Sequence, residues 1–166
     1  MAEKLFSFYE AVLKALVRLL AVISGMGIMA MIAVTVIDVL LRKSPFPFIG
    51  AYDIVQIAGA VTIAAALPYT TAVKGHVAIE FFYHKLGCTG RIVLDIFLRT
   101  LAIALFSYAA WYSYLYGNSL NASGQVSQTL QWPIFWLPYL FAVSFAVMVL
   151  VILQNLFRPG KEMIKP

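Results

Sequence analysis

Long runs of apolar residues dominate the chain and are separated by short polar stretches. Four of these runs have the length of about 20 residues, or slightly more, that an α-helix needs to cross the hydrocarbon core of a bilayer. They cover residues 19–41, 54–73, 92–116 and 132–157. None alternates apolar and polar residues as the strands of a membrane barrel do, and open strands cannot satisfy their backbone in lipid. The pattern therefore predicts an all-α membrane protein with four transmembrane helices.

Two further segments are amphipathic instead of uniformly apolar. Polar side chains recur every three or four positions in residues 3–18, as on one face of a helix: Glu3, Ser7, Glu10, Lys14 and Arg18. Glu10 precedes Lys14 by four positions, which is the favourable order for an ion pair on a helix. In residues 76–86 a second polar stripe recurs every four positions among large apolar residues: His76, Glu80 and His84. We expect both segments to form interfacial helices that lie at the headgroup level.

The composition agrees with a membrane protein. Of the 166 residues, 63% are hydrophobic and 11% are charged, and the mean hydropathy is +0.90. A soluble domain carries about 25% charged residues, so these values exclude an ordinary soluble enzyme and a disordered chain. The length indicates a single membrane domain over residues 1–166. The net charge of +5 does not indicate a nucleic-acid partner, because the basic residues flank the apolar runs, as expected for a membrane protein.

The distribution of these basic residues predicts the orientation. Nine Lys and Arg residues lie in the N-terminal segment, in the connection between the second and third runs, and in the C-terminal tail. The opposite side holds two, Arg42 and Lys43. By the positive-inside rule, both termini are expected in the cytoplasm. We expect no cleavable signal peptide, because Glu3 and Glu10 interrupt the basic leader that such a peptide requires.

Charged residues within or beside the apolar runs are candidates for structural or partner contacts, because each is costly in lipid. Asp38 and Arg42 lie one helical turn apart at the end of the first run, and Asp95 and Arg99 repeat this spacing in the third. An internal ion pair explains both, although the first pair is also placed to contact a partner subunit. Asp53 opens the second run, where a carboxylate can cap a helix and meet its positive dipole end. Gln56 requires a hydrogen-bond partner, either Asp53 or a neighbouring helix.

The apolar runs also offer surfaces for helix packing. Small residues recur every four positions along the second run, a pattern that lets helices approach closely: Ala58, Thr62, Ala66 and Thr70. The first run offers Ser24, Gly25 and Gly27 for the same purpose.

The chain offers no recognisable catalytic, metal or cofactor site. His76 and His84 are eight positions apart, or about 12 Å along a helix, whereas zinc holds its ligands at about 2 Å. Both histidines lie in one connecting segment, not on facing helices as haem requires, and Cys88 is the single cysteine. There is no nucleophile with its base, and no inverted repeat of the kind that builds a substrate site in transporters. The sequence therefore predicts a packing subunit, not an enzyme or a self-contained carrier.

Several local motifs resemble the small membrane subunit of tripartite ATP-independent periplasmic (TRAP) transporters. The first run ends in Asp38-Val39-Leu40-Leu41-Arg42 and is followed by a Pro-containing loop that leads to Asp53. The second run closes with Lys74-Gly75-His76-Val77. The segment from Ser127 to Pro133 is similar to the family's Ser-x-x-Leu-x-x-Pro start of the fourth helix. Asp53 departs from the pattern, because many relatives are expected to have Glu there.

The resemblance implies a multi-pass protein of the bacterial inner membrane. It would be a static scaffold for a separate, large elevator subunit that takes up an organic acid with sodium. It would also form part of the docking surface for a periplasmic binding protein. An alternative is the membrane anchor of a respiratory complex, although its haem would need histidines on facing helices.

The resemblance also implies residue roles. Asp38, Arg42 and Asp53 would organise the outer ends of the first two helices, and His76 and Glu80 would anchor the cytoplasmic interfacial helix. Residues of the two outer loops would contact the binding protein: Lys43, Phe46, Gln125, Gln128 and Gln131.

Overall fold

The part of the chain that the structure describes forms four helices. The computed structural model describes residues 2–42, 48–73 and 88–157, without the side chains of residues 2–8, 88–92, 95 and 155–157. The helices are α1 (Ala2–Leu41), α2 (Ala51–Ala72), α4 (Cys88–Ser123) and α5 (Trp136–Phe157). Each contains a stretch long and apolar enough to cross a membrane. The predicted all-α fold with four membrane helices is thereby confirmed.

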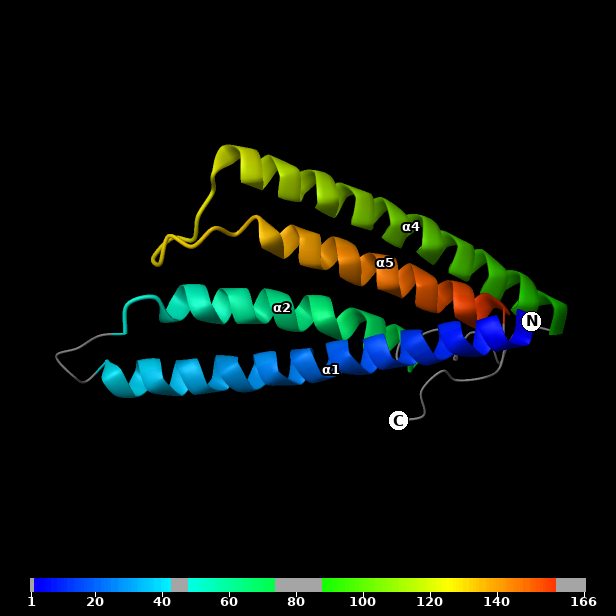
Figure 1. Ribbon diagram of the computed structural model, residues 1–166, viewed down its shortest axis with the longest axis horizontal. Coiled ribbons are helices and arrows are strands. Elements are labelled where there is room, and N and C mark those ends of the chain that lie inside the picture. Colours follow the sequence, from blue (N-terminus) through cyan, green and yellow to red (C-terminus); the bar gives the residue numbers. More distant parts are fainter. Residues whose placement is uncertain (1, 43–47, 74–87, 158–166) are drawn as a thin grey trace.

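The helices lie side by side in a single row in the order α1, α2, α5, α4 (Figure 1). Two antiparallel hairpins, α1–α2 and α4–α5, meet through packing of α2 on α5. We call the end of the row that carries the α4–α5 connection the loop end, and the end at which α1 begins and α5 finishes the terminal end. Because α1 and α4 occupy the two edges of the row, a large part of each surface is not covered by the other helices.

A small apolar core joins three of the helices in the half of the row nearer the terminal end. It consists of buried side chains from α1, α2 and α5: Leu13, Val17, Leu20, Ala65, Ala72, Val147 and Val151. The hydroxyl of Tyr9 on α1 donates a hydrogen bond to the carbonyl oxygen of Leu150 on α5, at 3.4 Å. The first and last helices of the chain are therefore in contact at this end.

Small residues allow α1 and α2 to approach closely, as the sequence predicts. A Cβ atom at Gly27 would collide with the hydroxyl oxygen of Thr62 and would lie 3.4 Å from the carbonyl oxygen of Ala58. By contrast, a Cβ atom at Gly25 would meet no atom of another helix within 4 Å, and Gly25 is exposed. Of the two glycines, Gly27 alone makes the predicted close approach within this chain.

The first amphipathic segment is part of α1 and not a separate helix. α1 is one unbroken helix of 40 residues, about 60 Å long. The expected break between residues 18 and 19 is absent because no Gly or Pro precedes Ser24, and most residues there favour helix. The predicted Glu10–Lys14 ion pair forms, with 2.7 Å between Oε1 and Nζ. The second predicted interfacial helix, 76–86, lies outside the described residues.

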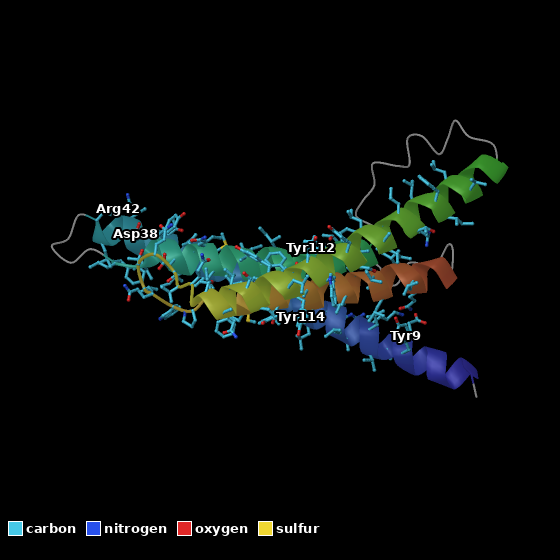
Figure 2. The ribbon with its side chains drawn as sticks, turned by 90° about the horizontal axis from the view of Figure 1, so that it is seen from above. Tyr9, Asp38, Arg42, Tyr112 and Tyr114 are labelled. Carbon is cyan, nitrogen blue, oxygen red and sulfur yellow. The ribbon has the colours of Figure 1, made fainter. Side chains whose placement is uncertain are left out.

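The helices differ in length. α2 and α5 have 22 residues each, or about 33 Å, which matches the hydrocarbon core of about 30 Å. α1 and the 36-residue α4 are longer, and they diverge at the terminal end (Figure 2). At this end, α1 and α4 are therefore expected to extend beyond the hydrocarbon core.

Candidate functional site

The connection between α4 and α5 is a compact hairpin-like loop, residues 124–135, which we call the α4–α5 loop. The N–H of Ser127 donates to the carbonyl oxygen of Trp132 at 2.8 Å, and the N–H of Trp132 donates back to the Ser127 hydroxyl at 3.1 Å. Val126 and Pro133 form an isolated antiparallel bridge just outside this pair. The two sides of the loop are thus held together by its own backbone.

A buried carboxylate from α2 holds the tip of this loop. The backbone N–H groups of Thr129 and Leu130 both donate to Oδ2 of Asp53, each at 2.7 Å. The Thr129 hydroxyl lies 3.4 Å from Oδ1. Asp53 is 1% exposed. We call the bonds of Asp53 to Thr129 and Leu130, together with the two bonds between Ser127 and Trp132, the Asp53 network.

The sequence suggested that Asp53 caps its own helix, but in the structure it does not. The N-cap of α2 is Gly50, which makes no side-chain capping bond and has a left-handed backbone with φ of 104°. Asp53 lies in the first turn of α2, and its carboxylate accepts hydrogen bonds from the loop. The sequence did not reveal this role because the donors are backbone groups 76 and 77 positions away.

Gly50 also makes room for the loop. A Cβ atom at this position would lie 2.6 Å from Cδ2 and 2.7 Å from Cγ of Leu130. The Leu130 side chain thus packs directly on the Gly50 backbone, while the Leu130 N–H binds Asp53. Gly50 was not identified from the sequence, and Thr129 and Leu130 were recognised only as part of the Ser127–Pro133 motif, without their contact to Asp53. The sequence signal that could have pointed to this contact is Gly50, three positions before Asp53 at the start of the second apolar run.

The α4–α5 loop presents uncharged polar side chains on its surface. The three glutamines expected to contact a partner are all exposed: Gln125, Gln128 and Gln131. Gln131 has a left-handed backbone with φ of 55°, which is uncommon for a residue other than glycine. No charged residue occurs between Thr100 and Phe157. The other two residues predicted to dock a partner, Lys43 and Phe46, lie outside the described residues.

The Asp38–Arg42 ion pair forms at the loop end of α1, as its spacing predicts. Nη2 and Nε of Arg42 lie 2.8 and 3.1 Å from Oδ2 of Asp38. The Arg42 side chain is 73% exposed and that of Asp38 19%. Figure 2 shows both residues where α1 finishes, away from Tyr9 at the opposite end of the molecule. The guanidinium is therefore held by Asp38 and remains accessible to a partner.

The remaining predicted residues are not brought together with this site. Gln56 is exposed on α2 and is not a donor to Asp53. Arg99 is half-buried on α4. His76, Glu80 and the side chain of Asp95 lie outside what the structure describes. Within the described ranges, no three His, Cys, Asp or Glu side chains come close enough to hold a metal ion.

Comparison with known proteins gives one family match. A family model described as "Tripartite ATP-independent periplasmic transporters, DctQ component" matches residues 31–161. This range covers most of the chain and includes the ion pair of α1 and the whole Asp53 network. No curated protein matches the sequence.

Proposed function

Because the chain belongs to the DctQ family and is thus the small membrane subunit of a TRAP transporter, we propose that it is a static scaffold. In this proposal it braces a large elevator subunit that takes up an organic acid together with sodium ions. Its loop end forms part of the docking surface for the periplasmic binding protein. The observation that carries the scaffold role is that the two helical hairpins contact each other at both ends of the row.

The contacts between the hairpins are apolar at one end of the row and polar at the other. At the terminal end, Val17 of α1 and Val151 of α5 are fully buried in the apolar core that these helices share with α2. At the loop end, the Asp53 carboxylate joins α2 to the α4–α5 loop through two short hydrogen bonds. A row secured at both ends resists sliding of one hairpin past the other. This supports a subunit that stays fixed while its partner moves.

The exposed apolar surface of the row supports the proposal that the chain binds a large membrane partner. An 18-residue apolar window of α4 contains no buried residue, and only 11% of the corresponding window of α1 is buried. The exposed surface of α1 carries aliphatic side chains such as Leu19 and Met29, and among them lie small residues, which favour close packing between membrane helices: Ala15, Gly25, Ala30 and Ala33. The exposed surface of α4 differs in carrying large aromatic residues beside its leucines: Phe97, Leu101, Leu105, Tyr108 and Trp111. We propose that the α1 edge contacts the large subunit and that the α4 edge faces lipid.

Photo-crosslinking tests this assignment of the two edges. A photoreactive amino acid in place of Ala33 on α1 should crosslink to the large subunit, whereas one in place of Leu101 on α4 should crosslink to lipid. The reverse result would contradict the assignment.

The proposed location is the bacterial inner membrane, with both termini in the cytoplasm and the loop end in the periplasm. The excess of basic residues on the terminal side supports this orientation. A cysteine introduced at Gln128 should react with a membrane-impermeant maleimide in intact spheroplasts. Cys88 on α4 should react only after the membrane is opened. The opposite labelling pattern would reverse the orientation.

Purification of the tagged chain from its native membrane tests the proposal as a whole. Mass spectrometry should find a stoichiometric partner with many membrane spans, and the purified pair with its binding protein should show sodium-dependent uptake in proteoliposomes. Recovery with soluble redox subunits would instead favour the anchor of a respiratory complex.

A further inference from the structure

We propose that the Asp53 network holds the α4–α5 loop in its docking conformation before any partner binds, and that this loop binds a soluble protein through uncharged hydrogen bonds. The proposal rests on the proposed docking function and makes it specific. Asp53 is then a positioning residue: it touches no partner, but it sets the place of the glutamines that do. The occupant is a folded protein surface rich in neutral donors and acceptors.

The loop is fixed along both of its sides and at its tip. Ser127 and Trp132 exchange two hydrogen bonds across the loop, at 2.8 and 3.1 Å. The tip between them is held at Thr129 and Leu130 by the carboxylate of Asp53. Hydrogen bonds to an ionised group are roughly twice as strong as neutral ones. These contacts come from a membrane helix and from the loop itself, so they exist without a partner.

The backbone of Gln131 indicates that this conformation serves binding. Gln131 has φ of 55°, and residues held in such sparsely populated regions cluster at functional surfaces. Its two neighbours are both fixed, because the Leu130 N–H binds Asp53 and the Trp132 backbone binds Ser127. The side chain of Gln131 remains exposed. The strained residue is thus the one that the network displays at the surface.

The chemistry of the loop determines what it can bind. Glutamine offers one carbonyl acceptor and two N–H donors, and the loop has no charge with which to attract an ionic patch. Arg42 supplies the accessible cation of the loop end described by the structure, and it lies on α1, at one edge of the row. Salt should therefore weaken the contribution of Arg42 and leave that of the loop unchanged.

Loss of the network should weaken binding because the loop of the unbound protein then leaves its docking conformation more often. An Asn at position 53 can still place a carbonyl oxygen where Oδ2 accepts both N–H groups, but it has no negative charge, and neutral hydrogen bonds are roughly half as strong. If the loop then adopts its docking conformation for about a tenth of the time, the apparent affinity for the partner falls about tenfold. The loss occurs although no residue that touches the partner has changed.

The experiment uses the chain with its large subunit in lipid nanodiscs and the purified periplasmic binding protein of the same transporter. Hydrogen exchange of the Thr129 and Leu130 amides should be slow in the free wild-type complex and fast in Asp53→Asn. The Kd of Asp53→Asn should rise about tenfold at both low and high salt. Gln128→Ala is the matched control, because it should weaken binding while exchange at Thr129 and Leu130 stays slow.

Ser127→Ala provides a second, milder variant in case Asp53→Asn does not assemble. It removes the acceptor for Trp132 and leaves α2 unchanged, so it should raise both the exchange rate and the Kd. Fast exchange in the free wild-type complex would overturn the proposal, as would an unchanged Kd in a variant whose loop has loosened. Failure of the wild-type complex to bind the binding protein would instead refute the docking function itself.

Discussion

The Oδ2 atom of Asp53 lies 2.7 Å from the backbone nitrogen of Leu130, although 77 positions separate the two residues in the sequence. The same oxygen accepts the N–H of Thr129 at 2.7 Å. One carboxylate therefore joins the start of α2 to the connection between α4 and α5. Because the carboxylate is buried and the donors are backbone groups, this contact depends on side-chain charge at one position only.

Replacement of Asp53 should destabilise the protein. Asp53→Asn leaves the N–H groups of Thr129 and Leu130 with a neutral acceptor in place of a carboxylate, and a hydrogen bond to a charged group contributes about 1.5–3 kcal/mol against about 0.5–1.5 kcal/mol for a neutral one. We expect the thermal unfolding midpoint of the detergent-purified chain to fall by about 5 °C or more. Asp38→Asn is the matched control, since it alters a carboxylate of an exposed ion pair, and it should leave the midpoint nearly unchanged. Equal shifts in the two variants would contradict a special role for Asp53.

Gly50→Ala should be more harmful than Gly124→Ala. Both glycines have a left-handed backbone, with φ of 104° and 62°, and a side chain there costs about 1–2 kcal/mol. Gly124 has open space around its Cα, whereas a Cβ at Gly50 would meet Leu130 at 2.6 Å. Overpacking adds about 1–3 kcal/mol. Unfolding titrations with SDS should show this difference, and similar losses would mean that Leu130 moves aside freely.

A second glycine pair tests the packing of α4 on α5. A Cβ at Gly117 would lie 2.7 Å from the ring of Tyr139, whose hydroxyl donates to Asn118 Oδ1 at 2.7 Å. Gly117→Ala should therefore lower the free energy of unfolding by about 1–3 kcal/mol. In Gly25→Ala the new methyl group meets nothing within 4 Å, so the isolated chain should gain up to about 1 kcal/mol from helix propensity. A stabilised Gly117→Ala variant would show that Tyr139 is not tightly held.

Arg42→Ala should reduce uptake without affecting expression. The Asp38–Arg42 pair is exposed on the Arg42 side, and such pairs on a helix contribute about 0.3–0.5 kcal/mol. We therefore expect little change in thermal stability but slower uptake in proteoliposomes, because the cation that we propose to contact the binding protein is lost. The deficit should be larger at low salt than at high salt. Wild-type uptake by this variant would refute a role for Arg42 in docking.

The outcome for α1 shows why element boundaries are harder to predict than the elements themselves. The amphipathic pattern of residues 3–18 is a real feature of the helix, and its Glu10–Lys14 pair forms at 2.7 Å. What the pattern could not exclude is direct continuation into the apolar run. In the folded protein Leu13 and Val17 pack against α2 and α5, and this contact favours one helix over two.

The sequence by itself determined the membrane class, the four helices and the ion pairs Glu10–Lys14 and Asp38–Arg42, because hydrophobicity and spacings of three or four residues act within a single helix. Its motifs also indicated the TRAP family, which the family match confirms. Only the tertiary structure decided the order of helices in the row and the partners of Asp53. The physical reason is that these partners are backbone N–H groups in a distant loop. Every residue but proline carries such a group, so no residue type along the chain marks which ones a buried carboxylate will bind.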